Sequence, residues 1–127
     1  MGHIGREGQY SPLHAKSKSF AVDIVKLVKQ FNDWRIGSLF QQVLKSGTSI
    51  HANVKESEFA QSQADFITKL SISLKEANET KGWLEVLYES ECIPEASFNY
   101  LYPRCKELLA MLVASVKTAN TNKDMIK

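Results

Sequence analysis

The apolar residues of this chain recur at spacings of three and four positions, which is the pattern of one face of an α-helix. In the first such stretch, from about Ser17, the recurring positions are Phe20, Ile24, Leu27, Val28 and Phe31. Asn32 and Asp33 then mark a turn. A second helix is expected from about Trp34, with a stripe made of Ile36, Phe40, Val43, Gly47, Ile50 and Val54.

A third helix is predicted to begin after Ser62, because Asp65 follows three residues later in the capping-box position. Its apolar face continues to about Glu91, which would make it the longest helix of the chain. Gly82 falls inside this helix, at a cost of roughly 1 kcal/mol relative to alanine. We therefore expect Gly82 to be a close-packing site beside Trp83.

Pro94 fits the first turn of a fourth helix, where its missing N–H donor does no harm. Pro103 predicts a kink or a late start, and the helix is expected to fray after Lys117. The resulting organisation is a mobile N-terminal arm over residues 1–15, a helical domain over residues 16–119 and a polar C-terminal tail over residues 120–127. Four amphipathic helices with short connections predict an all-α fold, an antiparallel up-down-up-down four-helix bundle.

Several apolar residues lie off the main stripes and would stay wet in an isolated bundle. We therefore expect a second buried surface, and self-association is the economical explanation. These residues are Leu39, Leu44, Ile72, Trp83, Val86 and Tyr100.

Residues 46–57 form a run of small and hydroxyl residues inside the second helix, although such residues are average or poor helix formers. This composition suits a helix face that another backbone approaches closely. Asn53 and Glu56 are i, i+3 neighbours, and Glu76 and Glu79 repeat that spacing on the third helix. We interpret these polar residues as fixing register or interface contacts rather than as binding a ligand.

The net charge of +2 conceals a segregation, since residues 1–55 carry +5, residues 56–95 carry −6 and residues 96–127 carry +3. Complementary packing of solvated helix faces would explain this asymmetry. The alternative is that the basic half binds nucleic acid, RNA or DNA, through phosphate contacts. The candidate side chains are Lys16, Lys18, Lys26, Lys29, Arg35, Lys45 and Lys55.

Catalytic and metal-binding patterns are absent from the sequence. None of the three histidines follows a glutamate by three residues, as a di-iron bundle requires, and Cys92 and Cys105 lack partners for a zinc site. We read both cysteines as reduced thiols, and His51 as a half-buried histidine on a helix flank. No cofactor and no catalytic residue is expected. Without a signal peptide or an apolar run of about 18 residues, a cytoplasmic protein is the default, with no membrane association.

Four segments resemble the four-helix-bundle family named after the 23S rRNA intervening-sequence protein, to which the accessory proteins of diversity-generating retroelements are similar. They are KSKSFAVDIVKLVKQF at 16–31, SGTSIHANVKE at 46–56, AQSQADFITKLSISLKEANET at 60–80, and residues 83–87. The resemblance covers about residues 16–118. It implies a bundle that assembles into a ring, most often a pentamer. In the retroelement branch, it implies a basic platform for a reverse transcriptase and nucleic acid.

Ser49, Ile50, Asn53 and Glu56 match the family signature Ser-Ile-x-x-Asn-x-x-Glu, and Glu79 matches a family glutamate. His51 stands where close relatives usually have glycine. Leu44 and Lys45 replace paired arginines, and Asp23 replaces a basic residue, which weakens the nucleic-acid interpretation. The absence of a catalytic constellation, the surplus apolar residues and the charge segregation nevertheless favour a non-enzymatic homo-oligomeric scaffold binding RNA or DNA. The alternative is a protein-only adaptor that docks a partner protein such as a reverse transcriptase.

Overall fold

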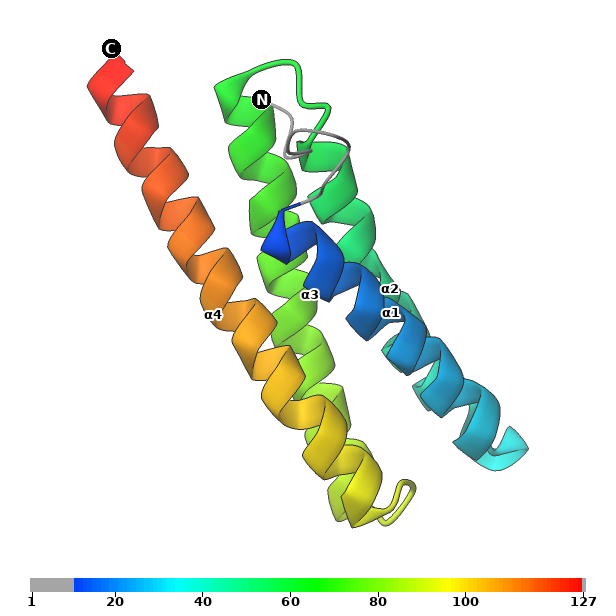
Figure 1. The fold of residues 1–127 in the computed structure, drawn as a ribbon. Helices are drawn as coiled ribbons and strands as arrows, with labels where there is room; N and C mark the ends of the chain where they lie inside the picture. The colour runs from blue at the N-terminus through cyan, green and yellow to red at the C-terminus, as the bar shows by residue number, and fades with distance from the viewer. Residues whose placement is uncertain (1–10, 127) are drawn as a thin grey trace.

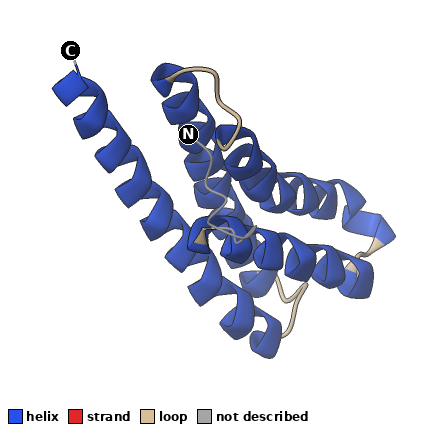
Figure 2. Ribbon diagram, turned by 45° about the horizontal axis from the view of Figure 1, so that its top comes forward, coloured by secondary structure: helices blue, strands red, loops and turns tan. Residues whose placement is uncertain are grey.

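The computed structural model describes residues 11–126 and the side chains of residues 11–122. The helices are α1 (Pro12–Phe31), the short 3-10 helix η2 (Trp34–Ile36), α2 (Gly37–Ser57), α3 (Gln63–Glu89) and α4 (Glu95–Ile126). The described part of the chain contains no strand (Figure 2).

Neighbouring helices run antiparallel, with the α2–α3 connection at one end of the molecule and the other two connections at the opposite end (Figure 1). Contacts join α1 with α2, α2 with α3 and α3 with α4, and α4 returns to α1 to close the bundle. The last of these contacts is by far the least extensive, so α1 is held mainly by α2. This arrangement confirms the predicted four-helix bundle.

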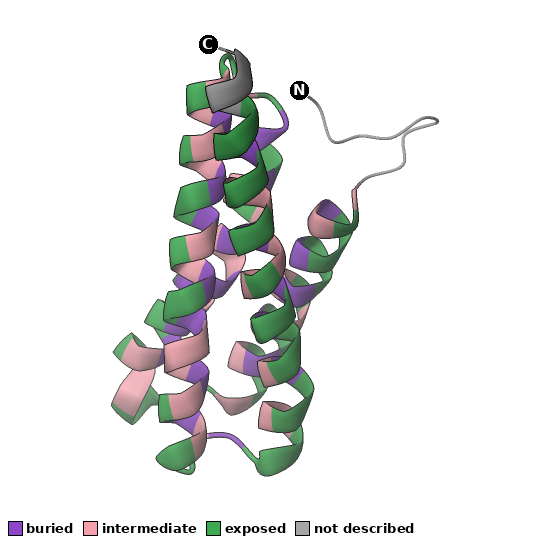
Figure 3. Cartoon of the chain, turned by 90° about the vertical axis from the view of Figure 1, so that its left-hand side faces the viewer, coloured by how far each residue is buried: buried purple, intermediate pink, exposed green. Residues whose placement is uncertain are grey.

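The core forms because the buried positions of each helix follow the heptad-like spacing of three and four. In α3, for example, the buried residues are Phe66, Leu70, Ser73, Ala77, Thr80, Leu84 and Leu87. Figure 3 shows such buried positions on the inner sides of the helices, with exposed positions outside. Small polar residues replace apolar ones at the α2–α3 contact. There the Ser73 hydroxyl donates to the Ile50 carbonyl at 2.8 Å, and the Thr80 hydroxyl donates to Ser46 at 2.9 Å.

The first helix begins at Pro12, earlier than the start near Ser17 predicted from periodicity. Ser11 is its N-cap, because the Ser11 hydroxyl accepts a hydrogen bond from the His14 backbone N–H at 3.1 Å. Proline is favourable at this first helical position, because the N–H that it lacks would have no partner within the helix and its fixed φ suits the helix. Residues 12–15 of the expected arm are therefore helical, and residues 1–10 lie outside the described residues.

Ser62 caps α3 as predicted, since its hydroxyl accepts from the Asp65 backbone N–H at 3.0 Å. The helix ends at Glu89 in a Schellman motif, in which Cys92 N–H donates to the Leu87 carbonyl at 2.8 Å. Glu91 takes the left-handed position that glycine usually occupies, with φ of 61°. This motif turns the chain into α4.

Two expectations about the second half of the chain are wrong. The longest helix is α4, with 32 residues against 27 in α3, and it runs through Pro103 and the expected tail to Ile126. Gly82 is not a close-packing site, because a Cβ built there would meet nothing within 4 Å. The spacing of apolar residues in the sequence does not distinguish a glycine that is merely tolerated from one that close packing requires.

Candidate functional site

Residues 46–57, the small-residue segment of α2, contact both neighbouring helices, some residues facing α1 and others facing α3. Gly47 faces α1, where a Cβ would lie 2.9 Å from Cγ1 and Cγ2 of Ile24. Ile50 is fully buried in the core. Glu56 faces α3 and pairs with Lys69 at 3.0 Å. The predicted close approach is confirmed at Gly47, although a side chain rather than a backbone causes it.

Asn53, Glu56 and Glu79 make local or flanking polar contacts. The Asn53 amide donates to the Ser49 carbonyl of its own helix at 2.9 Å, and Glu79 accepts from the Trp83 indole N–H at 3.3 Å. Burial and the neighbouring Glu79 raise the pKa of Glu76 above its ordinary value. Asn53 and Glu76 are half-buried, Glu56 and Glu79 are exposed, and the register role inferred for these residues stays a prediction.

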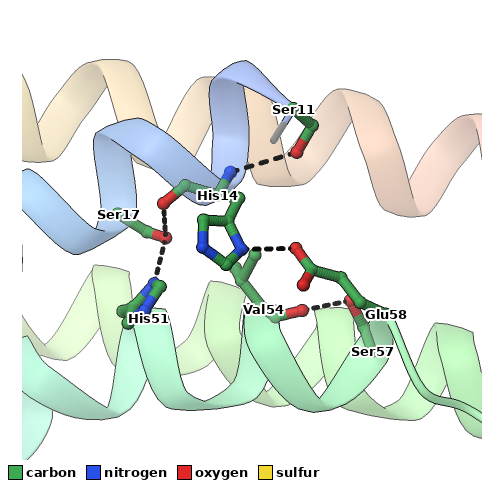
Figure 4. A network of polar contacts seen from close by, with 7 residues as sticks. All are labelled: Ser11, His14, Ser17, His51, Val54, Ser57 and Glu58. Atoms are coloured by element: carbon green, nitrogen blue, oxygen red, sulfur yellow. Dashed lines mark hydrogen bonds and ion pairs between the residues drawn. The ribbon is translucent and has the colours of Figure 1, made fainter. Parts of the chain in front are cut away.

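His51 belongs to a polar network at the α1–α2 contact that the sequence did not reveal (Figure 4). Its Nδ1 lies 3.0 Å from the Ser17 hydroxyl, and that hydroxyl donates to the His14 carbonyl at 3.1 Å. The His14 Nδ1 lies 2.6 Å from Oε2 of Glu58, with both side chains at least 95% buried. The network ties the first turns of α1 to the last turns of α2.

The network is structural rather than catalytic in its geometry. A serine beside a histidine resembles a nucleophile and its base, but Ser17 is completely buried and no substrate can reach its hydroxyl. Burial lowers the pKa of His51, and repulsion from His14, Lys18 and Lys55 lowers it further. His51 is thereby kept neutral in the folded protein over a wider range of pH.

All seven cationic candidates are exposed, but the structure does not bring them together on one face. Lys16 pairs with Glu107 on α4 at 2.7 Å, and Arg35 pairs with Asp33 at 2.6 Å. Lys26 lines a pocket between α1 and α4, which we call the α1–α4 pocket. Lys45 lies close enough to Glu76 to lower the pKa of that carboxyl.

The remaining three lysines define what we call the α1–α2 lysine face: Lys18, Lys29 and Lys55. Lys18 and Lys55 both lie near His51, since both lower its pKa. Lys29 follows Lys18 by 11 residues, slightly more than three helical turns, and therefore shares its side of α1. None of the three pairs with a carboxylate of the described residues. The only acids of α1 and α2 are Asp23, which lines the α1–α4 pocket, and Glu56, which pairs with Lys69 of α3.

The two cysteines are free thiols, as expected, with Cys105 buried and Cys92 half-buried. Within residues 11–126, no group of three histidine, cysteine or acidic side chains could hold a metal ion. None of the helices described is both long enough and apolar enough to cross a membrane.

Comparison with known proteins identifies the relatives of the chain. The family model for the 23S rRNA-intervening sequence protein matches residues 12–114. A similar solved structure is that of a protein with unknown function from the S23 ribosomal protein family of Bacteroides thetaiotaomicron. It is 44% identical in sequence, covers 83% of this chain and 98% of its own, and has a TM-score of 0.78. No curated protein matches the chain.

Proposed function

The chain belongs to the 23S rRNA-intervening sequence protein family, and from this premise we propose that it is a non-enzymatic, homo-oligomeric scaffold that binds nucleic acid. The binding surface is the α1–α2 lysine face. The observation that carries this proposal is the presence of three exposed lysines without carboxylate partners on one side of the bundle. Such a surface attracts phosphates without needing a sequence motif.

Self-association supports the same function, because a ring repeats the α1–α2 lysine face in every subunit. Ile72, Val86 and Tyr100 are 38%, 44% and 49% exposed, as expected for a bundle that has a further surface to bury. A pentamer is the assembly that the family resemblance favours. Several copies of three lysines would bind one nucleic acid much more tightly than a single copy.

The test is the salt dependence of binding to a fluorescent RNA and a DNA duplex, followed by polarisation. Three phosphate contacts per subunit predict log K falling with log salt at a slope of about −2 to −3. Reversing two charges (Lys18→Glu with Lys55→Glu) should reduce the magnitude of that slope by about 1.4–1.8 per bound subunit. The same charge change at the exposed lysines of the opposite helices (Lys75→Glu with Lys117→Glu) is the matched control.

Binding that ignores salt, or that falls equally in the control variant, would contradict contact through this face. In the same assay, the affinities for RNA and DNA of equal length show which nucleic acid is preferred.

A protein-only adaptor is the second candidate, and a stripe on α3 favours it. Along one side of that helix, residues recur at spacings of three and four that are at least half-exposed, with two acidic groups between apolar ones: Ile72, Glu76, Glu79, Trp83 and Val86. Such a stripe suits a partner protein that offers a basic, apolar groove. If this function holds, Ile72→Asp should abolish capture of the partner, whereas Lys18→Glu with Lys55→Glu should leave that capture unchanged.

A further inference from the structure

The most exposed large apolar side chain of the described residues is Trp34, at 89% exposure. It stands in the η2 turn between α1 and α2, and its neighbours fix the backbone on both sides. Asp33 Oδ1 accepts from the Arg35 backbone N–H at 2.9 Å and from Nε at 3.0 Å, while Oδ2 accepts from Nη2 at 2.6 Å. The indole is therefore presented by a preordered turn, which reduces the entropy lost when it is buried by a partner.

A pocket of ≈ 290 Å³ lies between α1 and the first turns of α4. Leu27 and Leu101, both nearly fully buried, contribute apolar surface to it. Tyr100 and Lys26 also line it, and Asp23 adds a carboxylate that has no hydrogen bond or ion pair with any described residue. The pocket exists because α4 packs so sparsely against α1.

This pocket and the Trp34 indole match in size and in chemistry. A cavity of about 150 Å³ accommodates benzene, so this pocket can hold the larger indole. The indole ring has an N–H donor and no acceptor atom, so it needs a partner that accepts, and the Asp23 carboxylate supplies one. Tyr100 can pack against the ring, and the Lys26 ammonium can lie over its face.

We propose that Trp34 of one copy of this chain inserts into the α1–α4 pocket of the next copy. The inference rests on the proposed homo-oligomer and names its contact. A second copy is the occupant because one chain carries both parts, each without a partner of its own. Since the inserted residue and the pocket are different surfaces, the contact is head-to-tail, the kind that closes into a ring when its rotation allows.

The first test compares the masses of the parent chain and two variants by light scattering after size exclusion, over a range of concentrations. Buried tryptophans dominate many interfaces, so Trp34→Ala should raise the dissociation constant about 30-fold or more. Because the side chain is so exposed, its removal leaves the bundle folded. Phe59→Ala removes another exposed aromatic, which is 71% exposed in the α2–α3 connection, and should leave assembly unchanged.

A mixing experiment tests the pairing itself. Ala96 is exposed at the pocket, so Ala96→Arg obstructs the pocket while Trp34 remains. The Trp34→Ala variant has the opposite defect. Each variant alone should be monomeric, and their equimolar mixture should form a dimer of about twice 14.3 kDa, because one intact contact is restored.

The outcomes separate the two proposals. A parent chain that stays monomeric at every concentration would refute the homo-oligomer and the contact together. An oligomeric parent whose Trp34→Ala variant assembles equally well would refute the contact alone. So would equal losses in the Trp34→Ala and Phe59→Ala variants, because assembly would then depend on exposed aromatic surface in general.

Discussion

Replacing Gly47 with alanine tests how closely α1 approaches α2. The new Cβ would lie 2.9 Å from two carbons of Ile24 and 3.2 Å from a third, whereas carbon atoms pack at about 3.5–4.0 Å. Ile24 is fully buried, and a β-branched side chain in a helix has essentially one rotamer. The strain can therefore be relieved only by moving the two helices apart.

The size of the effect follows from a comparison with Gly82. Both replacements gain about 1 kcal/mol of helix propensity, but overpacking at position 47 costs about 1–3 kcal/mol. Gly82→Ala has open space and should be stabilising by the full gain. Gly47→Ala should thus be less stable than Gly82→Ala by about 1–3 kcal/mol. Urea unfolding followed by circular dichroism, at one fixed protein concentration, measures this difference.

A double-mutant cycle with Ile24 locates the cause. Ile24→Ala removes both of the closest carbons, so its cost of about 2–5 kcal/mol should shrink in the Gly47→Ala background by about 0.5–3 kcal/mol. Ile24→Val keeps Cγ1 and Cγ2, and should show almost no coupling. Equal stabilisation by alanine at positions 47 and 82 would refute the reasoning, because it would mean that α1 leaves room for the methyl group.

Three further variants follow from single features of the structure. Glu91→Gly should raise the free energy of unfolding by about 0.5–1 kcal/mol, because glycine adopts the positive φ of the α3 cap without strain; a loss of stability would contradict the cap assignment. Since the pKa of His51 is lowered in the folded state, the unfolded chain binds a proton first, and stability is lost as the pH falls below about 6.5. His51→Asn should reduce the difference in melting temperature between pH 7.5 and pH 5, and an unchanged difference would remove His51 as its source. Burial raises the pKa of Cys105 to about 12, so a thiol reagent at neutral pH should modify Cys92 quickly and Cys105 only on unfolding; two fast thiols would argue against the buried position.

The helices and their order could be predicted because periodicity reports which face of a helix is buried. Gly47 was also predictable, since a glycine on the apolar stripe implies close contact. Gly82 was misread because the sequence does not show what lies opposite a residue. The start of α1 was missed although Ser11 and Pro12 carry the ordinary signals of an N-cap and a first turn.

The contacts between distant positions could not be predicted. His14 and Glu58 are separated by 44 residues, and no local pattern pairs a histidine of one helix with a carboxylate at the end of another. The sequence places Trp34 at about the start of the second helix and does not indicate that its side chain is exposed. Its exposure depends on the η2 turn, which is built by the side chain of Asp33.

The weak contact between α1 and α4 has a consequence for local unfolding. Helix α3 packs extensively against both α2 and α4. Helix α1 depends mainly on α2, including the His14–Glu58 and His51–Ser17 contacts. Partial opening should therefore begin with undocking of α1, while the other three helices stay associated. Amide hydrogens of α1 would then exchange with solvent through a lower-energy opening than those in the middle of α3, which exchange only when the whole bundle unfolds.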